Sequence, residues 1–339
     1  MQAIDLIQSA AGAFGTSLSQ SLPGTAGFWA GGLAWYMVLT SVLAAVALRR
    51  AGGWSVRRHL AHLFPPENYR NFSARITHWH FLIYALFWAP IYALLLVTPV
   101  LVSDAVASTL GEWLGPRRAL LHENWAIVAL QAGPIMVAMS LASYMYHYAS
   151  HRVPILWSFH RAHHSVEALT LPATARDHPV DILAIRLCMN LVGGLAGGVA
   201  MYFTGTSIDP TTFVVVGLGA VIYFAAVGVF NHTHVPVSFG WFNRLFMASI
   251  LHQYHHSAED RHRDTNIGSF CGLMIWDWMF GTLYLPRKGE TYRWGLNEHE
   301  MGENNPHRRL RDFYLEPFAH AWATLRGTAG RSGVALSSR

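Results

Sequence analysis

The stretch TGTSIDP, residues 204–210, decides how many times the chain crosses a membrane. It separates two charge-free apolar windows, Leu187–Ile208 and Pro210–Phe230, each close to the roughly 20 residues that a helix needs to span a bilayer. Its Gly, Ser, Asp and Pro are turn-forming residues, so we predict a tight turn between two antiparallel spans. If the whole region were one span, the segments before and after it would lie on opposite sides of the membrane.

Composition also indicates a membrane protein. Hydrophobic residues make up 52% of the 339 positions and charged residues only 13%, against about 25% charged in ordinary soluble proteins. Three further charge-free windows are long enough to span: Phe28–Leu48, Phe81–Ser103 and Asn124–Tyr146. We therefore predict an all-α polytopic membrane protein of about five transmembrane helices. Gly193 and Gly194 are each followed by a second glycine four residues later, which favours close packing of helices in lipid.

Arginines predict the orientation. They are concentrated in 49–80, 147–186 and 231–339, and the positive-inside rule places these segments in the cytoplasm. They do not gather in one run, so membrane topology explains the net charge of +5 better than nucleic-acid binding does. Lys288 is the only lysine, which suggests a GC-rich bacterial genome. We therefore expect an integral protein of a bacterial inner membrane.

Two strings share one spacing, HRAHH at 160–164 and HQYHH at 252–256, and an even number of predicted spans places both on the cytoplasmic face. On a helix, residues three and four apart share a face, so the first histidine can bind one ion together with a later one. The last two histidines lie about 100° apart and can face two neighbouring ions. With HYASH at 147–151 and two single histidines, the candidate ligands are His147, His151, His160, His163, His164, His178, His232, His252, His255 and His256.

So many imidazoles on one face indicate a pair of metal ions. Imidazole binds iron, zinc and copper, whereas a structural zinc needs only four ligands. A dinuclear iron site that activates O₂ is therefore the sharper interpretation, with His234 as a reserve ligand. Four other histidines are expected to be solvated tail residues: His262, His299, His307 and His320.

The order of these motifs, together with DTNIGSFCGLMIWDWMFGT at 264–282, resembles the fatty acid hydroxylase/sterol desaturase superfamily over about residues 130–285. The resemblance implies an integral-membrane enzyme in which the ten histidines hold two iron ions, with O₂ as co-substrate and electrons from outside the chain. NHTH at 231–234 departs from the common pattern, because His234 stands where asparagine is usual.

Acidic residues near the boxes are candidates for supporting the ligands. Metal-bound imidazoles usually donate their second N–H to a carboxylate or a carbonyl. Asp264, Asn266 and Asp277 match the family pattern and are assigned this role. Glu167 and Asp177 also lie near the boxes, and simple solvation is the alternative for both.

Three regions follow from the pattern. They are an N-terminal membrane region with two spans and an Arg-rich connection at 1–130, a fatty acid hydroxylase-like catalytic region at 131–285, and a cytoplasmic tail at 286–339. The histidine boxes are expected to form a cytoplasmic helical cap on the spans. The apolar stretch 266–285 contains Asp277 and is interpreted as interfacial or re-entrant.

The predicted function is hydroxylation of a C–H bond in a lipid. Desaturation by the same di-iron centre is the nearest alternative, and a non-catalytic metal-binding or transport protein is an alternative of another class. Acyl chains, sterols, alkyl glycerols and amino-lipid headgroups are all candidate substrates, among which a glycero- or amino-lipid is favoured. The sequence has no Rossmann fingerprint or cysteine cluster, so the electron donor is expected to be a separate reductase with a ferredoxin or a cytochrome b5-like carrier.

Overall fold

A computed structural model describes residues 52–93, 98–116, 124–208, 210–223, 231–287, 289–301 and 304–327, with short pieces of 37–49 and single residues at 95 and 228. All regular structure in these residues is helical, and only two isolated β-bridges occur among them. The predicted all-α class is therefore confirmed for the described part of the chain. The chain divides into two compact units, Met1–Leu63 and Phe64–Arg339.

The first unit contains the described helix α2, Val56–Leu63. Ser41 and His59 share a hydrogen bond of 2.8 Å within this unit. Most of the first predicted span, 28–48, lies outside the described residues.

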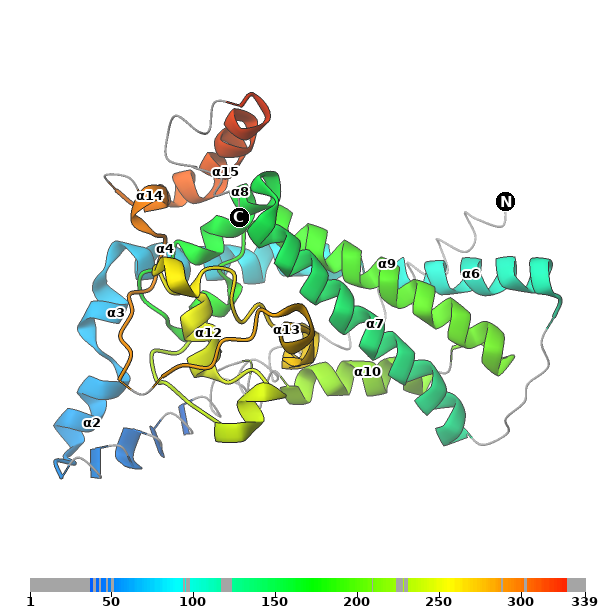
Figure 1. Ribbon diagram of the computed structural model, residues 1–339, viewed down its shortest axis with the longest axis horizontal. Coiled ribbons are helices and arrows are strands. Elements are labelled where there is room, and N and C mark those ends of the chain that lie inside the picture. Colours follow the sequence, from blue (N-terminus) through cyan, green and yellow to red (C-terminus); the bar gives the residue numbers. More distant parts are fainter. Residues whose placement is uncertain are drawn as a thin grey trace. The chain divides into compact units, whose positions relative to one another are not determined.

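The second unit contains the remaining helices (Figure 1). Two of them, α7 (Asn124–Arg152) and α9 (Pro179–Thr204), are long and apolar enough to cross a membrane. In chain order the helices are α3 Pro66–Arg70, α4 Phe72–Ile83, the π-helical turn η1 Tyr84–Trp88, α5 Ala89–Ala93, α6 Thr98–Leu114, α7, α8 Pro154–His164, η3 Leu171–Ala175, α9, α10 Pro210–Tyr223, η5 Gly240–Arg244, α12 Ser249–His255, η6 Asp260–His262, η7 Phe270–Gly272, α13 Ile275–Phe280, α14 Glu298–Met301 and α15 Leu310–Leu325.

The predicted turn at 204–210 is present. Helix α9 ends at Thr204, and Gly205 follows in the left-handed conformation, with φ of 67°, that commonly ends helices. Helix α10 begins five residues later at Pro210. The short connection expected from the sequence therefore joins α9 to α10, and α10 packs against α7. Five membrane spans remain a prediction.

Glycines let α9 approach its neighbours closely. A Cβ atom added to Gly198 would lie 2.5 Å from Cβ of Val106 in α6, and one added to Gly193 would lie 2.8 Å from Cγ of Met139 in α7. Ser103 of α6 also donates a hydrogen bond of 3.0 Å to the carbonyl oxygen of Gly194. Helix α9 thus packs against both α6 and α7, and the predicted role of the paired glycines is confirmed.

Two apolar stretches differ from simple spans. The window predicted at 81–103 is divided among the end of α4, η1, α5 and the first residues of α6. The stretch 266–285 contains only η7 and the six-residue helix α13, which is far shorter than the roughly 20 residues needed to cross a bilayer.

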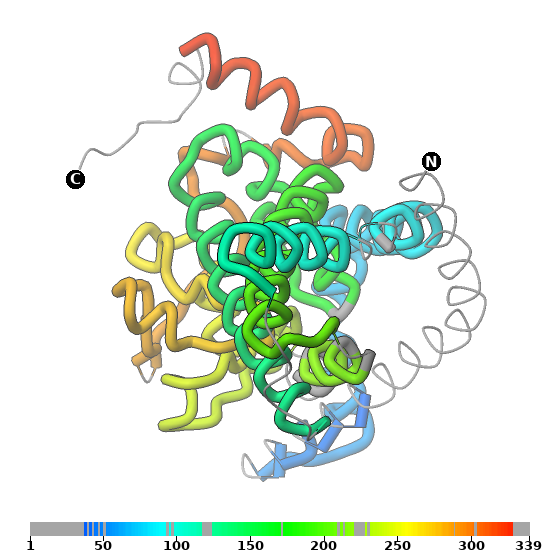
Figure 2. Tube along the Cα trace, turned by 90° about the vertical axis from the view of Figure 1, so that its right-hand side faces the viewer, coloured from blue at the N-terminus to red at the C-terminus, as the bar shows by residue number. Residues whose placement is uncertain are grey.

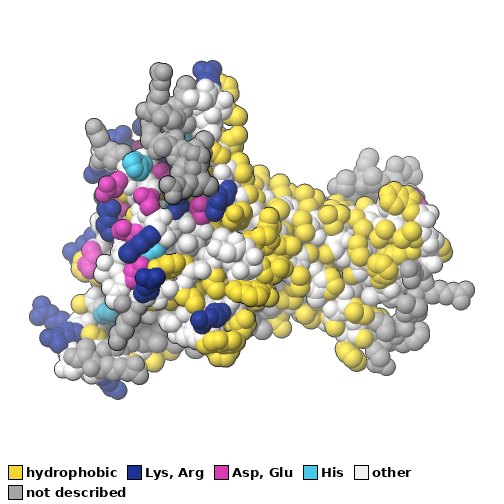
Figure 3. Space-filling model, in the orientation of Figure 1, with side chains coloured by type: hydrophobic (Ala, Val, Ile, Leu, Met, Phe, Trp, Pro, Cys, Tyr) yellow, Lys and Arg dark blue, Asp and Glu magenta, His cyan; other side chains and the backbone are white. Residues whose placement is uncertain are grey.

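Polar and apolar surfaces of the second unit are separated along the direction of the long helices. Hydrophobic side chains cover α7 and α9 on the face drawn in Figure 3, whereas Arg, Asp and Glu gather over the end that holds α8, α12 and α14. Figure 2 shows the same fold along the longest axis of Figure 1. The histidine boxes lie at the charged end, on α8 and α12 and at the end of α7.

Candidate metal centre

Three helix ends present the histidine boxes. Helix α8 begins with Pro154, a residue whose fixed φ suits the first helical position, and ends with His160, His163 and His164. Helix α12 carries His252 and His255, and the C-terminal end of α7 carries His147 and His151. All three helices therefore place their histidines on their final turns, and these three helix ends lie close together.

Nine of the ten predicted ligands meet in two groups, in which every residue except the half-buried His147 is buried, and the ligand nitrogens within each group lie within 4.8 Å of one another. The first group contains five histidines and the second contains four. The members are His147, His151, His160, His164 and His255 in the first group, and His163, His232, His252 and His256 in the second.

Each His-x-x-His-His string is divided between the groups. His160 and His164, four residues apart, belong to the first group, while His163 belongs to the second. The other string is divided in the opposite sense, because His255 alone joins the first group. This division follows from helical geometry, since residues four apart lie one above the other on the helix surface.

The spacing of the ring nitrogens fits metal coordination. Nε2 of His160 lies 3.0 Å from Nε2 of His147 and 3.2 Å from Nε2 of His164. In the second group, Nε2 of His232 lies 3.0 Å from that of His252 and 3.3 Å from that of His163. Two nitrogens bound about 2.1 Å from one ion would lie about 3.0 Å apart at a right angle and about 3.4 Å apart at the tetrahedral angle.

Burial keeps His164, His255 and His256 neutral, which is the form that binds metals. Burial lowers the pKa of His255 to about 3, and burial together with the neighbouring rings holds the pKa of His164 and His256 well below the usual value. Nε2 of His151 and Nε2 of His255 are buried and have no hydrogen-bond partner. Such unpaired buried nitrogens are costly unless an ion occupies the space between them, so the residues fit a metal pair.

Four ligand candidates contact an oxygen atom through Nδ1, the ring nitrogen that points away from the group. Nδ1 of His151 lies 3.4 Å from Asp264, and Nδ1 of His163 lies 3.0 Å from Asp177. Nδ1 of His255 donates to the carbonyl oxygen of Thr265 at 2.9 Å. These contacts fix the ring orientation and leave Nε2 for the metal.

The fourth contact was not foreseen in the sequence. Asp181, in the first turn of α9, accepts a hydrogen bond of 2.8 Å from Nδ1 of His160 and one of 2.7 Å from the Tyr146 hydroxyl. Asp181 follows His178 by three residues in HPVD. The short spacing between this acid and a predicted ligand is the sequence signal that could have identified Asp181 as a supporting residue.

Two residues predicted to support the histidines, Asp277 and Asn266, contact the backbone near the site instead of the histidine rings. Asp277 accepts hydrogen bonds from the backbone N–H groups of Ile267 and Gly268, and Asn266 bonds backbone atoms of Leu251 and Tyr284. Neither side chain has a described contact with a histidine ring. They instead hold the 264–268 loop, which carries Asp264 and Thr265 to their histidines.

His178 and His234 lie outside both groups. Nδ1 of His178 accepts a hydrogen bond from the Val180 N–H at the start of α9, and its Nε2 lies 3.2 Å from the carbonyl oxygen of Tyr314. The structure therefore engages both ring nitrogens of His178 in backbone contacts. Glu167 likewise binds Asn305 rather than a histidine.

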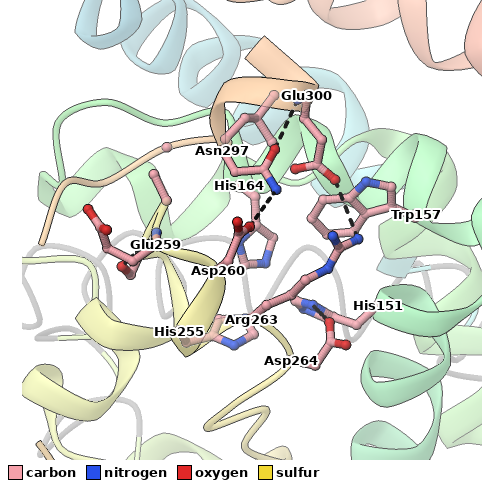
Figure 4. A pocket seen from close by; sticks show the side chains of 14 residues that line it. His151, Trp157, His164, His255, Glu259, Asp260, Arg263, Asp264, Asn297 and Glu300 are labelled. Carbon is pink, nitrogen blue, oxygen red and sulfur yellow. Dashed lines mark hydrogen bonds and ion pairs between the residues drawn. The ribbon is translucent and has the colours of Figure 1, made fainter. Parts of the chain in front are cut away.

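A polar pocket adjoins the first group (Figure 4). His151, His164, His255 and Trp157 line one part of it. Most of the other lining side chains are charged or polar and include Glu259, Asp260, Arg263, Asp264, Asn297 and Glu300. Four carboxylates and one guanidinium give this lining an acidic balance.

Residues 134–282 match the fatty acid hydroxylase family. This region is similar to that family. The match confirms the predicted superfamily and includes all nine grouped histidines. Histidine clusters that fit a metal site therefore lie in a fatty acid hydroxylase region.

A curated relative adds a more specific likeness. The chain is 31% identical over 192 residues to the ornithine lipid hydroxylase OlsE of Rhizobium tropici, and this alignment covers 57% of the chain and 53% of the relative. The chain thus spans about half the length of that relative. No solved structure matches the chain.

Proposed function

We propose that the protein is a membrane-bound lipid hydroxylase with two iron ions at the nine grouped histidines. The observation that carries this proposal is the pair of adjacent all-histidine groups inside a fatty acid hydroxylase region. His164 of the first group and His256 of the second support a pair rather than two remote sites, because their ring centroids are 4.6 Å apart. The ions would supply activation of O₂ for insertion of one oxygen atom into a C–H bond.

The chain's own residues would prepare the site for this chemistry. Asp181, Asp177 and Asp264 hold the rings of His160, His163 and His151 in fixed orientations. Burial excludes water and keeps His164, His255 and His256 neutral. In the overall reaction, a lipid C–H group, O₂, two electrons and two protons yield a lipid C–OH group and water.

The electrons would come from a separate donor. The proposed donor is a reductase with a ferredoxin or a cytochrome b5-like carrier. The proposed location is a bacterial inner membrane, with about five spans and the metal centre at the cytoplasmic face. The Arg-rich segments and the long apolar helices α7 and α9 support this arrangement.

An amino-lipid is the proposed substrate class. The relative's name refers to ornithine lipid, whose headgroup derives from an amino acid that bears amines. Amines are protonated at neutral pH, and the carboxylates of Glu259 and Asp260, which line a small pocket of about 40 Å³ beside the first group, would attract the ammonium of such a headgroup. Asp260 and Glu259 line this pocket and belong to the segment that follows HQYHH.

Lipid analysis tests the proposal. Lipid extracts of a deletion strain, the complemented strain and a His164→Ala strain would be compared by tandem mass spectrometry. We expect a lipid that gains one oxygen only in the complemented strain, with the oxygen in the headgroup fragment. A loss of two hydrogens would instead indicate desaturation, and identical lipids in all three strains would reject an oxidative function.

A further inference from the structure

Helix α15 exposes an apolar face that no described part of the chain covers. Its exposed hydrophobic side chains are Leu315, Phe318, Trp322 and Leu325, with 60%, 51%, 57% and 63% of their surfaces accessible. The spacing of three, four and three residues places them on one side of the helix. The opposite side is buried, with Phe313, Pro317 and Ala321 in the interior. A helix in water would carry polar residues on the exposed side.

Basic residues flank this apolar face. Arg308, Arg309 and Arg311 lie at the start of α15 and are exposed. At its other end, the Arg326 guanidinium lies 4.6 Å from the centre of the Trp322 ring. Arginine at the edges of an apolar face, with tryptophan beside it, is the composition of helices that lie in the headgroup region of anionic membranes.

The direction of α15 also suits a membrane surface. Figure 2 looks along the longest axis of Figure 1, the direction along which the charged end and the apolar surface of the second unit are separated, and α15 runs across this view. A helix that runs across this direction lies along the plane of a bilayer that surrounds the apolar surface. Figure 3 shows hydrophobic side chains along α15 that continue into those over the long helices. The apolar face of α15 therefore adjoins the surface proposed to face lipid.

Polar contacts connect α15 to the helix that carries the first histidine box. Glu316 of α15 accepts a hydrogen bond from Arg161 of α8 and also lies 2.9 Å from Nε2 of His307. Ser158 of α8 and His320 of α15 share a hydrogen bond of 2.8 Å. Ser158 and Arg161 flank His160 along α8. A displacement of α15 would therefore also move the turn of α8 that carries His160.

We propose that α15 is an interfacial helix that lies in the headgroup layer of the bilayer and fixes the depth of α8. Leu315, Phe318, Trp322 and Leu325 enter the lipid, and the flanking arginines contact anionic headgroups. This inference rests on the membrane location given under the proposed function. It assigns to the last described helix a membrane contact instead of the solvated tail predicted from the sequence.

Quenching by brominated lipid tests this contact directly. In the full chain with Cys188→Ser and Cys271→Ser, a bimane fluorophore would be attached at Phe318→Cys or, as a control, at Glu298→Cys, whose native side chain is 90% exposed. The protein would be reconstituted into vesicles of phosphatidylcholine and phosphatidylglycerol with brominated acyl chains. We expect strong quenching at position 318 and little at position 298. Equal, weak quenching at both positions would overturn the proposal.

Protection from a water-soluble maleimide separates lipid from protein as the occupant. A cysteine at position 318 that is protected but not quenched would be covered by protein, such as a second copy of this chain, and this would also overturn the proposal. Neither measurement needs bound metal or turnover. Failure of the proposed function would instead appear as a lipid profile without an added oxygen while quenching persists.

Matched variants test the link to the metal site. Phe318→Glu with Trp322→Glu should decrease quenching of bimane at Leu315→Cys and reduce oxidised lipid by roughly tenfold, because two large apolar side chains lose their burial in lipid. Phe318→Leu with Trp322→Leu should retain both signals. Iron content would be measured in each variant to detect misfolding. Unchanged quenching in the charged variant would contradict the proposal.

Discussion

At the scale of single residues, the two histidine strings work as a reciprocal pair. His160 and His164 belong to the first histidine group while His163 belongs to the second, and the second string reverses this arrangement. One helix turn therefore contributes to both positions. On a helix, the residue four positions later is displaced by only about 40° around the axis and the residue three positions later by about 60° in the opposite direction, so the last two histidines of a string point about 100° apart.

Double variants test this division. His160→Ala with His164→Ala removes two ligand candidates from the first group only, so about one iron per chain should remain, in the second group. His163→Ala with His164→Ala removes one candidate from each group and should deplete both positions. Metal analysis of the purified proteins would measure this difference. His178→Ala is the control and should keep both ions, since His178 lies outside the groups. Equal loss from both double variants would contradict the division.

Asp181 offers a second test at this scale. Asp181→Asn weakens the partner of Nδ1 of His160, and loss of such a partner typically lowers metal affinity about 10–100-fold. Competition with a chelator would measure the affinity. Glu167→Gln is the matched control, because Glu167 is an acid near the same box that binds Asn305. A chelator curve for Asp181→Asn that overlays the control would argue against this role.

At the scale of helices, close contact of α9 with α6 depends on glycine. Gly198→Ala would place a Cβ atom 2.5 Å from Cβ of Val106 and 2.6 Å from the carbonyl oxygen of Ser103. Because backbone must move to relieve this clash, we expect a loss of about 1–3 kcal/mol of stability. Thermal unfolding in detergent would show a lower midpoint. Gly217→Ala in α10 meets nothing within 4 Å and should leave the midpoint unchanged or slightly higher. Equal midpoints for the two variants would reject the packing argument.

Helices with strong local signals were predictable, and features that depend on packing were not. TGTSIDP contains its own turn residues, and Gly193 and Gly194 show their spacing in the sequence. The histidine groups could be anticipated because helical spacing brings their members together locally. By contrast, His262 and His307, expected to be solvated, are fully buried against distant segments. Long-range contacts of this kind, such as His262 with Glu290 or Asp181 with His160, leave no periodic signal in the sequence.

At the scale of the whole molecule, buried neutral histidines make stability depend on pH. Burial lowers the pKa of His307 to about 4 and that of His255 to about 3, from an ordinary 6.5. Below about pH 6.5 the unfolded chain binds protons at these positions and the folded protein does not. The free energy of unfolding of the metal-free protein should therefore fall as the pH decreases from about 7 to about 5.

Thermal unfolding of the chelator-treated protein across this pH range would measure the effect. His307→Gln removes one titrating group outside the metal groups and should flatten the dependence. A midpoint that rises on acidification would contradict the expected sign.

The central claim is that two ions share one chain. Iron and zinc content, measured together with protein concentration on enzyme purified from iron-replete membranes, tests it most directly. We expect about two iron ions per chain, one for each histidine group. A content of about one ion per chain, or zinc in place of iron after iron-replete growth, would contradict the di-iron proposal.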